Sequence, residues 1–176
     1  MAQLAARYRP QVVLDMHEFT VGERWVSKFG GWSKYDVLLQ AATTGNLNEG
    51  IYRAGMQDFL PAIRQAVQAE GLSDFWYHTT SADPKAPVAM GGVQPDTWRN
   101  IGGLRNAVSI LHETRGIGLG KAHLARRVQS HVVATQALIE QMAAQGQALV
   151  ALGRRVDRDV AAQACKGQIT VAAGQT

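Results

Sequence analysis

Three short runs of β-forming residues, separated by helical patterns, constrain the fold of this chain of 176 residues. They are QVVLDMH (11–17), DFWYHTT (74–80) and NAVSILHE (106–113), each bounded by turn residues. Strands that alternate with helical patterns predict an α/β domain in which helices pack on a sheet. Three strands make a thin sheet for so much helix, which indicates that part of a larger sheet is missing.

The helical patterns differ in length and in how they are bounded. WSKYDVLLQAAT (32–43) is compatible with a short helix, and residues 48–71 have apolar residues near helical spacing. Within 48–71, Pro61 is expected to begin or kink a helical segment, and Gly71 to stop it. The longest helical pattern covers 121–152. Its apolar face is marked by Val128, Val132, Ile139 and Met142.

Two other segments look irregular. Residues 81–103 form a long stretch rich in Pro and Gly, and loops of that length in compact domains are usually functional or disordered. The tail 167–176 is small and polar and is expected to fray. With neither a repeat nor a second domain in evidence, residues 1–176 are interpreted as one domain.

Composition excludes several classes of protein. No run of eighteen apolar residues occurs, so no membrane span is expected, and the one cysteine, Cys165, excludes an internal disulfide or a cysteine-based zinc cluster. The formal charge is +4, but no basic stripe is interleaved with aromatic residues, so no nucleic-acid partner is expected. Arg7 and Arg9 follow the first apolar residues instead of preceding them, which argues against a signal peptide. The compartment stays undetermined.

The first β-forming run ends in Asp15-x-His17-Glu18, an ending that a buried strand does not need. Ligands of α/β proteins gather at the carboxyl ends of strands. A neutral imidazole at His17 can bind zinc there, while Asp15 orients it through the second ring nitrogen. The alternative is a histidine that is only hydrogen-bonded.

The third run also ends in charged residues, in NAVSILHETRGIG. A carboxylate at the end of a buried strand is costly unless it is paired or functional. Glu113 is therefore a candidate general base and acid, and the alternative is a surface pair with Arg115 or Lys121. His112 alternates away from Glu113 and is interpreted as structural.

The loop MGGVQPDTWRNIGGLRN contributes Arg99 and Arg105, whose planar guanidinium groups can hold a carboxylate by two hydrogen bonds. Asp96 or Asn100 is expected to shape the turn. Arg99 is the candidate for substrate binding, and the alternative is a solvated side chain.

The motifs VVLDMHEF and GLRNAVSILHETRGIG, in this order, resemble the C-terminal half of the zinc carboxypeptidases of the carboxypeptidase A type. The resemblance covers roughly residues 10–150 and implies a partial mixed β-sheet flanked by helices. It also implies that His17 is a zinc ligand and that Glu113, after the turn Gly103–Asn106, is the catalytic glutamate. GGVQPDTWRN and the Glu after the His resemble the bacterial members most, and relatives of this kind are often exported.

One departure from the family is large. The family's other two zinc ligands lie in a His-x-x-Glu motif before this His, and its main Asn-Arg substrate clamp also precedes it. Only sixteen residues precede His17, and His-x-x-Glu occurs nowhere in the chain. One imidazole cannot hold zinc in a three-ligand site. The sequence thus resembles the second half of an enzyme and is expected to be inactive alone.

The resemblance implies hydrolysis of a C-terminal peptide bond, with zinc as the cofactor and a peptide or small amide carrying a free carboxylate as the substrate. Deacylation of small N-acyl amino acids is an alternative reaction for the same groups. A catalytically dead binding or assembly module, or a gene fragment, is the alternative from another class. Half a sheet also exposes an unpaired edge, so self-association is expected.

Overall fold

The structure is a computed structural model that describes residues 2–164 and 166–170. In chain order its elements are α1 (Ala2–Tyr8), β1 (Val12–Thr20), α2 (Arg24–Phe29), β2 (Val37–Ala41), α3 (Glu49–Arg53), a π-helical segment η1 (Ala54–Phe59), α4 (Leu60–Ala69), β3 (Asp74–Trp76), α5 (Trp98–Leu104), β4 (Val108–Ile117) and α6 (Leu124–Ala162). Cys165 lies outside the described residues, as does the tail from residue 171 on. In the described part of the tail, the Thr170 amide donates to Asn46 Oδ1 at 2.7 Å.

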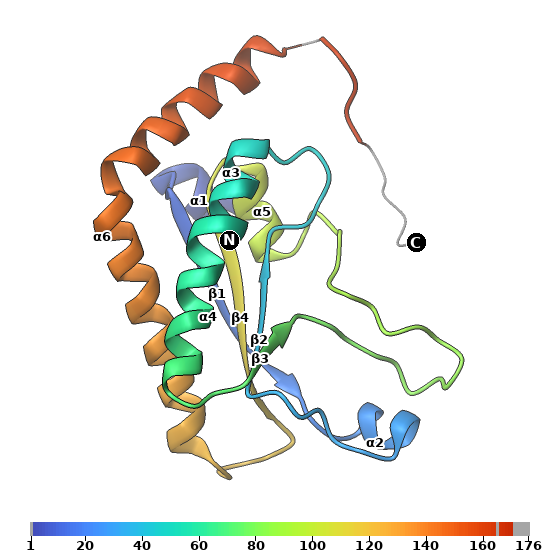
Figure 1. Ribbon diagram of the computed structural model, residues 1–176. Helices are drawn as coiled ribbons and strands as arrows, with labels where there is room; N and C mark the ends of the chain where they lie inside the picture. The colour runs from blue at the N-terminus through green and yellow to red at the C-terminus, as the bar shows by residue number, and fades with distance from the viewer. Residues whose placement is uncertain (1, 165, 171–176) are drawn as a thin grey trace.

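The four strands form one mixed sheet in the order β1-β4-β2-β3. β1 is parallel to β4, β4 is antiparallel to β2, and β2 is parallel to β3. Helices flank the sheet, and α6 runs along its side (Figure 1). The predicted α/β architecture, with a mixed sheet and a long C-terminal helix, is confirmed.

The strand β2 lies where the sequence predicts a short helix over 32–43, and that prediction is wrong. All five residues of Val37–Ala41 are buried, because β2 has a strand on each edge and protein on both faces. A strand of this kind is apolar throughout instead of alternating. Its short apolar run therefore cannot be told from a buried helical segment by periodicity.

The three predicted strands are all present, and one of them is shorter than predicted. β3 ends at Trp76, and Tyr77–Thr80 continue as an irregular segment that lies near the end of β1. The predicted long loop is interrupted by α5, which begins at Trp98. Gly102 on α5 lies against β4, and a Cβ atom there would meet Ser109 Oγ at 2.7 Å.

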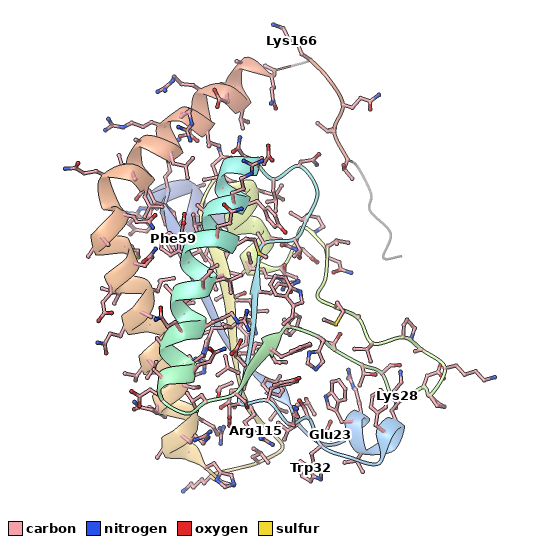
Figure 2. The ribbon with its side chains drawn as sticks, in the orientation of Figure 1. Glu23, Lys28, Trp32, Phe59, Arg115 and Lys166 are labelled. Carbon is pink, nitrogen blue, oxygen red and sulfur yellow. The ribbon has the colours of Figure 1, made fainter. Side chains whose placement is uncertain are left out.

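One face of the sheet is covered by α3, η1, α4 and α6 (Figure 1). Phe59, labelled in Figure 2, has no exposed surface in this core. Pro61 lies in the first turn of α4, which follows the π-helical segment η1 without a break. α4 ends at Ala69, and Gly71 adopts a φ of 68°, as expected of a helix stop.

The long helix α6 was predicted over 121–152 and extends to Ala162. Its predicted apolar face is wrong, because Val128, Val132, Ile139 and Met142 are exposed. The helix packs instead through three small side chains and four larger ones. The buried residues of α6 are Arg127, Ser130, Ala134, Ala137, Leu138, Leu149 and Val156. Small residues let a helix approach its neighbours closely. A search of the sequence for large apolar residues does not find a buried face of this kind.

The outer edge of β1 is open. Among the described residues β1 pairs with β4 alone, so one row of its backbone groups has no strand partner. Beside this edge, Met16 of β1 and Val132 and Ile139 of α6 line a shallow groove of about 600 Å³. The sheet could therefore continue on this side. No helix within the described residues is long and apolar enough to cross a membrane.

Candidate active site

The ends of β1 and β4 bring the two predicted site residues together. His17 and Glu113 are register partners on adjacent parallel strands, so they lie side by side near the same end of the sheet. Asp15 lies two residues before His17 and therefore points to the same face. We call this the site face. It is opposite to the face covered by α4 and α6.

His17 is held by the carboxylate beside it. Its Nε2 lies 2.8 Å from Asp15 Oδ1, as the sequence predicts, and Asp15 is buried. A carboxylate accepts, so Nε2 donates, and in the neutral imidazole Nδ1 keeps its lone pair. The imidazole is 54% exposed, and Nδ1 makes no hydrogen bond within the described residues. A second-nitrogen contact of this kind is common in histidines that bind metals.

Glu113 is a buried carboxylate, 6% exposed, that makes neither a hydrogen bond nor an ion pair within the described part of the chain. The expected alternative, a surface pair, is wrong, since Arg115 donates to the carbonyls of Ser33 and Lys34. Burial raises the pKa of Glu113 to about 7, and the charge of His17 lowers it less. A carboxyl group with a pKa near neutrality can both take up and release a proton.

Arg99 is not the solvated loop residue of the alternative interpretation. It lies on α5, is 4% exposed, and donates from Nη2 to the Gly92 carbonyl at 2.9 Å. Its Nε is buried without a partner in the described structure, and burial lowers the pKa of the guanidinium. The group lies 5.4 Å from the centre of the Tyr77 ring. Arg99 is thus a buried cation that makes no ion pair with a described residue.

The loop before α5 is fixed by Asn100, one of the two residues expected to shape it. Asn100 is fully buried, accepts from the Thr43 amide at 2.9 Å, and donates to the carbonyls of Gly92 and Gln94. These bonds tie the loop to the segment after β2. Arg99 is the residue directly before Asn100, so its position is set by the fold.

Sequence reasoning missed Tyr77 and the residues after it. The Arg99 and Glu113 charges both act on the Tyr77 hydroxyl, and burial raises its pKa. A cavity of about 190 Å³ lies next to Glu113 and is lined by Trp25, Tyr77 and Thr79 among others. The run DFWYHTT appeared to be one strand, and nothing in its alternation indicates that it leaves the sheet at Tyr77.

His112 lies on the opposite face, as its alternation with Glu113 predicts. It is fully buried, and its Nδ1 is 3.0 Å from Nδ1 of His131 on α6. Its Nε2 has no partner among the described residues, and burial lowers its pKa to about 3. This histidine joins α6 to the sheet and takes no part in the site face.

The described residues contain no cluster of three or more His, Cys, Asp or Glu side chains that could hold a metal ion. Among the described residues of the site face, His17 offers its Nδ1 beside its register partner Glu113. This part of the chain therefore fits one ligand of a three-ligand zinc site and does not fit the whole site.

The chain is similar in sequence to known carboxypeptidases. Over 140 residues, 78% of the chain, it is 33% identical to "Probable carboxypeptidase 2" of Trichophyton verrucosum and 32% identical to "Carboxypeptidase 2" of Trichophyton rubrum. The chain is a carboxypeptidase-like partial domain. It spans about 27% and 26% of the lengths of these two relatives. No family model and no solved structure matches it significantly.

These carboxypeptidase relatives are fungal proteins. The stronger likeness to bacterial members therefore stays a prediction. The similarity to carboxypeptidases supports a metal cofactor in general terms, while the roles of His17, Glu113 and Arg99 are taken up next as proposals.

Proposed function

We propose that this chain is the part of a zinc metallocarboxypeptidase that carries the general base and one metal ligand. The observation that carries the proposal is the pairing of His17 with Glu113 in adjacent register on the site face. The substrate class is a peptide, or a small amide, with a free terminal carboxylate. The names of the carboxypeptidase relatives support this class.

In this proposal each site residue has one task. Glu113 takes a proton from the attacking water and passes it to the leaving nitrogen, which requires a pKa near neutrality. Arg99 binds the terminal carboxylate of the substrate, because it is a buried cation whose Nε has no partner among the described residues. His17 would hold a zinc ion together with ligands from outside this chain, and the ion would polarise the scissile carbonyl and lower the pKa of its bound water.

The ligands that this chain does not supply must come from outside it. His17 is on the edge strand β1, and the Asp15 contact leaves Nδ1 available. Polypeptide that lies along the open edge of β1 could reach the same point. We therefore place the two further zinc ligands on polypeptide beyond that edge, in a segment that corresponds to part of the relatives not spanned by this chain.

A chimera tests this function. The segment of Trichophyton rubrum carboxypeptidase 2 that this chain matches is replaced by the chain, and release of C-terminal residues and zinc content are measured. We expect an active chimera in which Glu113→Gln lowers kcat by about 10²- to 10⁴-fold, the usual contribution of a general base. We expect His17→Ala to lower the zinc content. Glu70→Gln, at an exposed carboxylate on the covered side, is the matched control.

The outcomes of the chimera separate the alternatives. A folded chimera that binds zinc but hydrolyses nothing favours a catalytically dead module. Full activity in the Glu113→Gln variant contradicts the assignment of the general base. Zinc content that does not change in His17→Ala contradicts the assignment of the ligand.

The open edge of β1 also leads us to propose that the isolated chain self-associates. Unpaired strand edges and apolar grooves beside them recruit other chains. Light scattering after size exclusion is expected to show species larger than a monomer. Met16→Lys with Ile139→Glu is expected to shift them toward monomer, and Ala164→Glu, on the exposed end after α6, is the control. A monodisperse wild-type monomer contradicts the proposal.

A further inference from the structure

The cavity beside Glu113 is built by four segments far apart in the sequence. Phe19 at the end of β1, Arg24 and Trp25 on α2, His78 and Thr79 after β3, and Glu113 on β4 all line it. Its volume is about 190 Å³. In Figure 2, Glu23 and Lys28 mark α2, which lies on the far side of the sheet from α6. The cavity thus belongs to the site face.

Glu113 lies between this cavity and Arg99. The cavity is lined by Phe19, Thr20 and Ile117, which follow the His17–Glu113 pair toward the ends of the strands. Arg99 lies toward the beginnings of β1 and β4, against which α5 packs, and its guanidinium is 5.4 Å from the ring centre of Tyr77 in the cavity wall. A substrate whose terminal carboxylate is at Arg99 therefore extends past Glu113 into the cavity. This step rests on the proposed function.

The part of the substrate that enters the cavity is the acyl side of the scissile bond. The terminal residue lies between Arg99 and Glu113, because Arg99 holds its carboxylate and Glu113 acts at its amide. The residue before it then follows the direction of the strands toward Phe19 and Trp25. The cavity walls therefore contact the penultimate side chain of the peptide.

Arg24 is the arginine of the cavity wall, which also carries the carboxyl groups of Glu18 and Glu113. The Arg24 side chain is exposed and makes no ion pair or hydrogen bond with any described residue. Glu18, which also lines the cavity, is already paired, because Arg127 Nη2 lies 2.5 Å from Glu18 Oε1. Trp25 is fixed by its edge contact with His78, with ring centres 5.2 Å apart. The cavity thus offers one unpaired guanidinium beside an aromatic wall.

We infer that this cavity binds an acidic side chain on the penultimate residue of the substrate, and that Arg24 determines this preference. A guanidinium group binds a carboxylate by two parallel hydrogen bonds, which a neutral amide of the same shape cannot match. Trp25 covers the methylene groups of that side chain. Arg24 is a specificity-determining residue and takes no part in proton transfer.

Binding to the full chain tests the inference without catalysis. Acetyl-Glu-Leu and acetyl-Gln-Leu are titrated into the ¹⁵N-labelled chain, and dissociation constants come from amide and indole chemical shifts. We expect the Glu peptide to bind about tenfold more tightly, as a charge-assisted pair does over a neutral one. Arg24→Gln is expected to make the two affinities equal. Arg155→Gln, at an exposed arginine of α6, is the matched control.

Arg99→Gln separates this inference from the proposed function. It is expected to weaken both peptides by the same factor and to leave their ratio unchanged. Equal binding of the two peptides by the wild-type chain overturns the inference, as does a preference that survives Arg24→Gln or no binding of either peptide up to its solubility limit. If Arg99→Gln changes neither affinity, the terminal carboxylate lies elsewhere, and the placement of the penultimate residue fails with it.

Discussion

Replacing Glu113 with glutamine is expected to stabilise the isolated folded chain at pH 8 by about 2 to 3 kcal/mol, because a shift of one pKa unit corresponds to about 1.4 kcal/mol. The folded pKa of Glu113 is raised to about 7 from an ordinary value of 4.5. Above pH 7 the folded chain therefore holds an ionised carboxylate in a buried position without a hydrogen bond from any described residue. Glutamine keeps the shape and removes the charge.

The gain should depend on pH in a defined way. A raised carboxyl pKa favours the folded state as the pH falls from 7 to 4.5, so the advantage of Glu113→Gln shrinks over that range and vanishes below it. Urea unfolding of both chains at several pH values measures this. Glu70→Gln, at an exposed carboxylate, should change little at any pH. A Glu113→Gln chain less stable than wild type at pH 8 would contradict the expectation.

Such a gain would indicate that Glu113 is retained for a task other than folding. A charge that destabilises the folded chain and can be removed without loss of shape is typical of a functional site. The stability measurement on the isolated chain and the activity measurement on the chimera therefore test the same residue by independent routes.

Acid is expected to destabilise the chain through His112. Its folded pKa is lowered to about 3 from 6.5 by burial and by the facing His131, so the folded state stays neutral where the unfolded state binds a proton. Stability that is present above pH 6.5 is lost as the pH falls toward 3. Between pH 7.5 and 5 the loss is about 2 kcal/mol, at about 1.4 kcal/mol per pKa unit.

Over the same range, protonation of Glu113 stabilises the folded state as the pH falls. The free energy of unfolding of the wild-type chain should therefore change little between pH 7.5 and 5. The loss is measured in the Glu113→Gln chain, where the opposing titration is absent. Adding His112→Gln should remove most of the remaining pH dependence, while His78→Gln, at a histidine bonded to the Trp76 carbonyl, should leave it. If stability still falls with acid in the His112→Gln chain, groups other than His112 cause the loss.

The sequence predicts the positions of His17 and Glu113 at strand ends better than it predicts the strand β2. The ends of two β-forming runs place His17 and Glu113 at the end of the sheet, and the Asp15–His17 contact follows from a spacing of two residues. Those inferences need only the alternation of side chains along a strand. That His17 and Glu113 lie side by side depends on the register of β1 against β4, which cannot be read from the sequence.

Other features depend on the tertiary environment. β2 is buried on both sides because it is central, and its short run VLLQA lacks the alternation that marks a half-exposed strand. α6 buries Ser130, Ala134 and Ala137 and exposes Val128 and Val132, so the large apolar residues of its first half do not mark its buried face. Arg99 is buried because Asn100 ties its loop to the segment after β2, a contact between residues far apart in the sequence.

The pairing of β1 with β4 has a consequence for how the chain acquires its structure. Val12 pairs with Val108, so more than half of the chain lies between the two partners. Contacts of such long range form slowly, because the intervening segment must first be drawn together. During synthesis β1 leaves the ribosome before β4 and cannot pair with it until β4 follows. His17 and Glu113 therefore meet only late in folding, after most of the chain has been made.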